Sequence, residues 1–142
     1  MVTRTLPIRV NPARGEALDS WLEKIAHRTR SSFSDVLDAV GLEPGNGGSG
    51  LQGVKILRDT EVKSLATATG ARPDTIRAMT LARYNSIAVD IDEDSRTINR
   101  RTLWGRGTGS RFCPECLTAN EGRWSLSWRL GWVYACLTHE CL

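Results

Sequence analysis

The sequence predicts a mainly α-helical protein in which a helical unit over residues 1–84 precedes a smaller module with β character over residues 85–142. Apolar residues recur at helical spacing through the first unit, whereas the second holds all four cysteines and most of the tryptophans. With 142 residues, 40% hydrophobic and 25% charged, the chain has a globular composition and enough length for one domain or two small ones.

Two amphipathic helices are predicted before the first glycine-rich stretch. The first covers residues 11–30, with Pro12 and Gly15 marking its entry, and the second covers residues 34–40, with Gly41 as its stop. We expect the two helices to pack on each other through the apolar residues Leu18, Trp21, Leu22, Ile25, Ala26, Val36, Leu37 and Val40.

A second pair of helices is predicted after a glycine-rich connector at residues 43–50. Asp59 or Thr60 is expected to cap the third helix and Gly70 to end it. Pro73 suits the first turn of the fourth helix, where its missing N–H costs nothing. The buried positions of this pair are expected to be Val62, Leu65, Ala66, Ile76, Met79 and Thr80.

Residues 59–83 also fit the spacing of a helix-turn-helix. This motif needs a small residue where its helices touch, a glycine in the turn and an aliphatic residue inside the second helix. Ala66, Gly70 and Ile76 occupy those positions. In a DNA-binding motif, phosphates and base edges would be contacted by the candidates Lys63, Arg72, Thr75, Arg77 and Arg83. A helical hairpin that only packs or docks a partner is an equal alternative.

Short strands are predicted on either side of an acidic turn. Residues 86–91 alternate and are β-branched, residues 92–94 form the turn, and residues 97–104 supply the second strand. The carboxylates of Asp90 and of the turn are interpreted as solvated side chains, because no partner acid or base stands out in the sequence. Phosphate-loop and serine-nucleophile motifs are also missing from the sequence, so we predict no catalytic residues and no enzyme.

The most specific signal is a pair of metal-binding knuckles near the end of the chain. Cys113 and Cys116 form a Cys-x2-Cys half-site, and Cys136 and His139 form a Cys-x2-His half-site. Four such donors close a tetrahedron around one structural Zn²⁺, which leaves no open position for catalysis and predicts a small zinc-ribbon-like module. Cys141 is the alternative fourth ligand, but His139 repeats the two-residue gap of the first knuckle.

Three tryptophans, Trp124, Trp128 and Trp132, lie between the two knuckles. We expect them to wrap the zinc module and to seat it against the first helices, because aromatic side chains bury large apolar surfaces. Stacking on unpaired bases is the alternative use of these rings.

Charge and hydropathy indicate whether the protein contacts nucleic acid or a membrane. The net charge of +3 is compatible with nucleic-acid binding but does not prove it. No apolar run reaches the roughly eighteen residues of a membrane span, and the N-terminus lacks the apolar region of a secretory signal. We therefore expect a cytoplasmic protein without membrane contact, whose reduced cysteines serve as metal ligands and not as disulfides.

Several segments resemble proteins of the TniQ family. They are residues 6–10, Pro12, residues 16–22, residues 111–116, the arginine–tryptophan block of residues 123–130, and the closing residues 136–142. The resemblance implies a non-catalytic transposition accessory protein with a helix-turn-helix part joined to zinc-binding parts. Its zinc ligands carry over to Cys113, Cys116, Cys136 and His139. The chain stops three residues after His139, where family members commonly run on, so a truncated copy is one interpretation.

By this resemblance, the protein helps to recruit transposition machinery to target DNA. The implied partners are DNA together with a transposition ATPase, a transposase or an RNA-guided effector complex, and a homodimer is left open. Two other classes remain as alternatives. One is a zinc-containing helix-turn-helix transcriptional regulator, and the other is a protein-docking adaptor that makes no contact with DNA.

Overall fold

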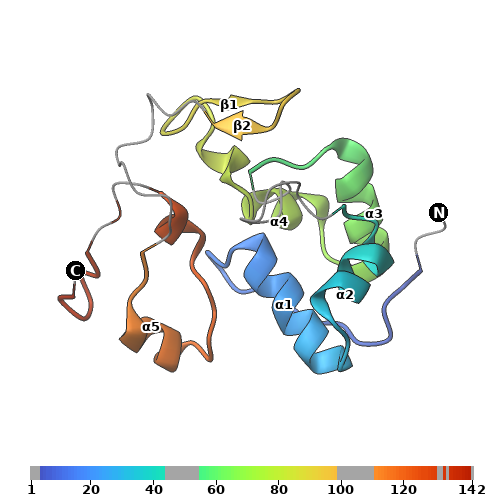
Figure 1. Cartoon of the computed structure of the whole chain (residues 1–142), viewed down its shortest axis with the longest axis horizontal. Helices are drawn as coiled ribbons and strands as arrows, with labels where there is room; N and C mark the ends of the chain where they lie inside the picture. Colours follow the sequence, from blue (N-terminus) through green and yellow to red (C-terminus); the bar gives the residue numbers. More distant parts are fainter. Residues whose placement is uncertain (1–3, 44–54, 99–110, 131–132, 134, 142) are drawn as a thin grey trace.

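Four helices lie together, with a two-stranded sheet at one edge and the knuckle-bearing segment beside them (Figure 1). The computed structural model describes residues 4–43, 55–98, 111–130, 133 and 135–141; most of the predicted connector, and Trp132, lie outside them. The elements are α1 (Leu18–Thr29), α2 (Phe33–Val40), α3 (Asp59–Thr69), α4 (Pro73–Ala78), the 3-10 helix η2 (Leu81–Tyr84), β1 (Ile91–Asp92), β2 (Thr97–Ile98), α5 (Pro114–Ala119) and the 3-10 helix η3 (Leu126–Arg129). The predicted mainly helical fold with a small sheet is confirmed.

Helix α1 begins at Leu18 and not at residue 11, so the predicted start is wrong. The chain that enters α1 instead forms backbone hydrogen bonds with a segment near the other end of the protein. The Gly15 carbonyl accepts the N–H of Leu126 at 2.8 Å, and the Ala17 N–H donates to the Trp124 carbonyl at 2.9 Å. Gly15 has a φ of +76°, a left-handed conformation that glycine adopts without steric cost. Hydrogen bonds to this distant segment therefore keep the residues before Leu18 out of the helix, although their sequence pattern is helical.

Helix α2 begins at Phe33, one residue before its predicted start, because Ser32 and Asp35 form a capping box. The Ser32 Oγ accepts the Asp35 N–H at 3.1 Å, and the Asp35 carboxylate accepts the Ser32 N–H at 3.2 Å. Hydrogen bonds from the Ser32 side chain and backbone lower the pKa of Asp35. Gly41, with a φ of +74°, ends the helix as predicted.

Replacing Ser32 with alanine is expected to lower the free energy of unfolding by about 1 kcal/mol, the usual cost of an N-cap. The pKa of Asp35 should rise toward its ordinary value in this variant. The pKa of Asp35 is lower in the folded protein than in the unfolded chain, so the ionised carboxylate stabilises the fold. This contribution is complete above the ordinary aspartate pKa and is lost as the pH falls through the pKa of Asp35 in the folded protein. Urea denaturation measures the change, with Ser34→Ala in the same helix as control. Equal stabilities of the two variants at neutral pH would contradict the capping role.

Helices α3 and α4 form a hairpin that turns at Gly70. Helix α3 has Arg58 as its N-cap residue and begins at Asp59, so the predicted caps, Asp59 and Thr60, are wrong. Gly70 ends α3 with a φ of +73°, and Pro73 opens α4, both as predicted. The turn of the hairpin therefore lies where the sequence predicts it, at Gly70 and Pro73. The N-cap of α3 is one residue before the first predicted cap, Asp59.

The main core lies between α1, α2 and the α3–α4 hairpin. The predicted apolar faces are buried in it, except that Ala66 is only half-buried. Trp21 is fully buried in this core, and its Nε1 donates to the Val10 carbonyl at 2.9 Å. The core residues include Leu18, Trp21, Leu22, Ile25, Val36, Leu37, Val40, Val62, Leu65, Ile76 and Met79.

The prediction of a strand at residues 86–91 is wrong for most of this segment. The N–H groups of residues 87–89 all donate to the Tyr84 carbonyl, at 2.9 to 3.1 Å, and this closes a turn. Among the described residues, the sheet pairs Ile91–Asp92 antiparallel with Thr97–Ile98. The remainder of the predicted second strand lies outside the described residues.

A second core lies where η2, the sheet and η3 meet the entry to α1. Its buried residues are Ala17, Leu81, Val89, Ile91, Leu126 and Leu130. They come from both sides of residue 84, where we predict a domain boundary, and the division into residues 1–84 and 85–142 stays a prediction. Within the described residues, no helix combines the length and the apolar character that crossing a membrane requires.

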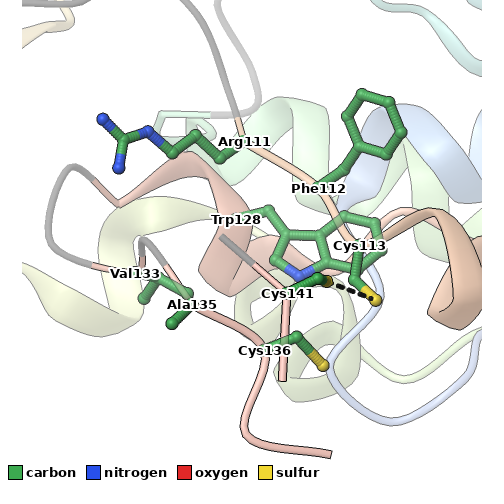
Figure 2. A pocket seen from close by; sticks show the side chains of 8 residues that line it. All are labelled: Arg111, Phe112, Cys113, Trp128, Val133, Ala135, Cys136 and Cys141. Carbon is green, nitrogen blue, oxygen red and sulfur yellow. Dashed lines mark hydrogen bonds between the residues drawn. The ribbon is translucent and has the colours of Figure 1, made fainter. Parts of the chain in front are cut away.

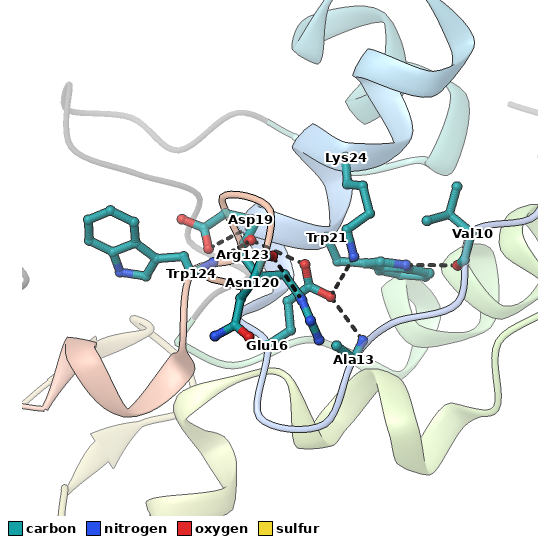
Figure 3. Close-up of polar contacts among 10 residues, drawn as sticks. Val10, Ala13, Glu16, Asp19, Trp21, Lys24, Asn120, Arg123 and Trp124 are labelled. Atoms are coloured by element: carbon teal, nitrogen blue, oxygen red, sulfur yellow. Dashed lines mark hydrogen bonds and ion pairs between the residues drawn. The ribbon is translucent and has the colours of Figure 1, made fainter. Parts of the chain in front are cut away.

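Glu16 is a buried carboxylate at the entry to α1, only 2% exposed (Figure 3). It accepts hydrogen bonds from the Ala13 N–H at 2.9 Å, from the Ser20 hydroxyl at 3.2 Å and from the Lys24 ammonium at 3.0 Å. The Ser20 Oγ in turn accepts the N–H of Trp124 at 2.9 Å. One carboxylate therefore orders both the entry to α1 and the contact between α1 and the segment that follows α5.

Candidate metal centre

The first knuckle is built at the N-terminus of helix α5. Cys113 is the N-cap residue, and its Sγ accepts the N–H of Cys116 at 3.4 Å. Pro114 occupies the first position of the helix, where proline forfeits no hydrogen bond. The local sequence therefore folds the Cys-x2-Cys segment so that the first sulfur receives a backbone N–H, the geometry expected of a metal knuckle.

The second knuckle is a tight loop that is closed by its own backbone. The Cys136 N–H donates to the Cys141 carbonyl at 2.9 Å, and these two residues form an isolated antiparallel bridge. Glu140 takes a positive φ of +51° within the loop, which helps the chain to reverse its direction. In this loop the Cys136 Sγ lies 3.5 Å from the His139 Nδ1.

The four donor atoms of the two knuckles converge. The His139 Nδ1 lies 3.2 Å from the Sγ atoms of both Cys113 and Cys116, and the Cys116 Sγ lies 3.6 Å from that of Cys136. All four ligand atoms lie within 4.8 Å of one another. Zinc bond lengths place the atoms of a tetrahedral sulfur–nitrogen set about 3.5–3.8 Å apart. The Cys3His group is therefore positioned to bind a metal ion.

The thiols of the group differ in how readily they ionise. Burial of Cys113 opposes the loss of its proton, but the Cys116 N–H and the neighbouring thiols stabilise the thiolate and lower its pKa to about 7. Burial and the neighbouring sulfurs raise the pKa of Cys116 to about 12. A backbone hydrogen bond from His139 lowers the pKa of Cys136. A bound cation would favour ionisation of all three, because metal ligation requires thiolates.

The imidazole of His139 has neighbouring side chains near both of its nitrogens. Its Nδ1 faces the sulfurs, and its Nε2 lies 3.8 Å from the Glu115 carboxylate. Metal-binding histidines usually turn their second nitrogen toward a carboxylate or carbonyl, which fixes the tautomer and the ring orientation. Glu115 is not among the residues predicted from the sequence, because the Cys-x2-Cys spacing does not show which side chain of the turn faces the other knuckle.

Cys141, the alternative fourth ligand, directs its thiol at that of Cys113 (Figure 2). Its Sγ is 3.3 Å from that of Cys113, and this contact raises the pKa of Cys141, whereas the four-donor group contains His139. All four cysteines are free thiols. The cavity beside them, lined in part by Phe112 and Trp128, has a volume of only about 20 Å³, space for about one water molecule.

Three aromatic rings pack together beside the first knuckle, and one ion pair connects η3 to α1. The Trp124 ring lies 5.3 Å from that of Trp128 in an edge-to-face arrangement, and 5.2 Å from the ring of Phe112. Arg129 of η3 pairs with Asp19 of α1. Two of the predicted tryptophans thus pack against each other, and the expectation that they seat the module against the first helices stays a prediction.

The five residues predicted to contact DNA are all exposed on or beside α3, α4 and η2. They are Lys63, Arg72, Thr75, Arg77 and Arg83. The Arg77 Nη2 lies 2.7 Å from the Asp59 carboxylate, and the Arg83 guanidinium lies 5.4 Å from the centre of the Tyr84 ring. Because α4 ends at Ala78, Arg83 lies on η2 and not on the second helix of the hairpin. The helix-turn-helix stays a prediction.

The fold and the site define a mainly helical protein with a metal-knuckle module built from three cysteines and one histidine. Comparison with protein families matches the TniQ family model to residues 7–142, nearly the whole chain. The chain therefore belongs to the TniQ family, as its sequence resemblance indicates, and is a transposition-associated protein. Searches among curated proteins and among solved structures find no match.

Proposed function

We propose that this TniQ-family protein helps to recruit transposition machinery to target DNA, without chemistry of its own. The observation that carries the proposal is the family match over residues 7–142. In this proposal its partners are DNA and a transposition ATPase, a transposase or an RNA-guided effector complex. One structural Zn²⁺ holds the C-terminal module together through Cys113, Cys116, Cys136 and His139.

The donor set and its surroundings support a structural zinc ion. Three thiolates and one imidazole are soft or borderline donors that suit Zn²⁺ in tetrahedral geometry. Four protein donors fill the tetrahedron, so no position is open for a substrate or an activated water. The cavity of about 20 Å³ beside the sulfurs is also too small to hold a substrate. Both observations favour a scaffolding role for the metal.

The α3–α4 hairpin supports contact with DNA. Its turn is made at Gly70, Ile76 is fully buried inside the second helix, and the five candidate contact residues are exposed. Arginine and lysine in this arrangement neutralise phosphates, and a threonine is able to hydrogen-bond to a base edge. We therefore propose that the exposed side of this hairpin contacts the duplex.

Replacing both Arg72 and Arg77 with alanine is expected to weaken the binding of duplex DNA. Loss of two phosphate contacts should reduce the slope of log affinity against log salt concentration by about 2. Fluorescence anisotropy of a labelled duplex across a salt series measures both quantities, and Arg14→Ala, at an exposed position outside the hairpin, is the control. An unchanged slope in the double variant would contradict DNA contact by the hairpin.

A docking adaptor is the second candidate function, and the shortness of α4 favours it. This helix has only six residues, Pro73–Ala78, and offers little length for the major groove. The same titration separates the two candidates. An adaptor shows no DNA binding at low salt, whereas a DNA-contacting protein binds there and loses affinity as salt rises.

A further inference from the structure

A polar cleft of about 670 Å³ lies between the N-terminal segment, α1 and the end of α5. Its volume is within the range of ligand-binding sites, roughly 300–1,000 Å³. Its charged or titratable lining residues are Arg9, Lys24, His27, Arg28, Glu121 and Arg123. Four permanent cations thus face a cleft that holds a single carboxylate, on a protein whose whole net charge is +3.

Three of these four cations have no ion-pair partner among the described residues. Lys24 is the exception, since the buried carboxylate of Glu16 lies 3.0 Å from its ammonium (Figure 3). Arg123 donates its Nε to the Asn120 carbonyl at 3.3 Å, a neutral acceptor that leaves its charge uncompensated. Arg9 and Arg28 are exposed. Three arginines without an ion-pair partner in the described part of the chain therefore line one cleft, and their combined positive charge attracts an anion.

The chemistry of this lining favours phosphate. Guanidinium groups bind phosphate oxygens through paired hydrogen bonds, and arginine is the preferred residue for phosphate recognition. A volume of about 670 Å³ is much larger than a single phosphate needs. The cleft therefore suits a chain of phosphates better than one isolated ion.

The cleft is continuous with the α3–α4 hairpin through Arg9. This residue lines the cleft, and its Nη1 lies only 2.7 Å from the place that a Cβ atom on Gly70 would occupy. Gly70 forms the turn of the hairpin, so Arg9 connects the cleft to the turn between α3 and α4. A nucleic-acid strand that leaves the hairpin at this turn would meet the cleft next.

We propose that this basic cleft binds the phosphodiester backbone of DNA where it continues past the hairpin. The proposal rests on the proposed function, that the protein contacts DNA. It adds Arg9, Arg28 and Arg123 as backbone contacts, on elements that the helix-turn-helix prediction does not include. These contacts are made to phosphates and not to base edges. They therefore raise the affinity for DNA of any sequence by the same factor.

The test is the salt dependence of duplex binding by the full-length, zinc-loaded chain. Removal of two phosphate contacts in Arg28→Gln/Arg123→Gln should reduce the slope of log affinity against log salt by about 2. Arg30→Gln is the matched control, because Arg30 is an exposed arginine at the end of α1 that does not line the cleft. Glu121→Gln removes the one carboxylate and should tighten binding about twofold to fivefold, an effect that misfolding does not produce.

Each result decides the proposal. If the wild type binds DNA but the double variant behaves like Arg30→Gln, the cleft proposal fails and the proposed function stands. If the wild type binds no duplex even at low salt, both fail. If adenosine monophosphate binds the wild type but not the double variant, while the salt slope of duplex binding is the same in both, the cleft holds a free nucleotide and the backbone proposal is overturned.

Discussion

Removal of the metal with a strong chelator is expected to unfold the segment that carries the two knuckles and to release about one Zn²⁺ per chain. The segment has little core of its own, because α5 contains no buried residue. Zinc binding to small zinc-finger peptides is worth roughly 10–16 kcal/mol, comparable with the entire stability of a typical domain, about 5–15 kcal/mol. Metal analysis and the fluorescence of Trp124 and Trp128 measure the change.

Two cysteine variants provide the matched comparison for this result. Cys116→Ser should lose the metal, whereas Cys141→Ser, which also removes one thiol, should keep it. Retention of Zn²⁺ by His139→Ala together with its loss from Cys141→Ser would identify Cys141 as the fourth ligand. A reduced wild-type protein that carries no metal and melts identically in chelator would contradict the zinc proposal altogether.

Replacing Glu16 with alanine is expected to lower the free energy of unfolding by about 3 kcal/mol. The substitution leaves the Ala13 N–H and the Lys24 ammonium without their acceptor. Removing one partner of a buried ion pair costs about 3–5 kcal/mol, and the low end applies because the Lys24 side chain is 26% exposed. Chemical denaturation followed by circular dichroism measures the loss.

Glu23→Ala is the control for this prediction, because Glu23 is an exposed glutamate on the same helix and its loss should change stability by less than about 0.5 kcal/mol. The free energy of unfolding of Glu16→Gln should lie between those of Glu16→Ala and Glu23→Ala. The amide oxygen of glutamine still accepts the Ala13 N–H, but it carries no charge to pair with Lys24. Equal stabilities of Glu16→Ala and Glu23→Ala would show that the buried network contributes nothing.

Local patterns predict most of the helical fold. The apolar spacing in α1 and α2 identifies the residues that are buried, and the glycines at positions 41 and 70 end helices with positive φ angles. Pro73 marks the first residue of α4. The two half-sites likewise identify the four donors that converge, because each is a local turn with a fixed ligand gap. In each case the decisive interaction lies within a few residues of the signal.

The features that the sequence does not predict depend on distant partners. The start of α1 is set by hydrogen bonds to Trp124 and Leu126, which no local pattern shows. Arg96 is only 8% exposed because its guanidinium binds both carboxylate oxygens of Glu61 at 2.9 Å. In sequence it is one arginine among many. The basic cleft is hidden for the same reason, since its cations come from three separate segments.

The backbone bonds that join Gly15 and Ala17 to the stretch before η3 also constrain how the protein is made. Leu126 and Leu130, which close the second core over Ala17, follow helices α1 to α4 in the chain and are therefore synthesised after them. The amino-terminal helices therefore emerge with part of their packing surface uncovered, and this surface stays exposed until residues 126–130 have been synthesised. Until then, chaperones and proteases have access to this surface.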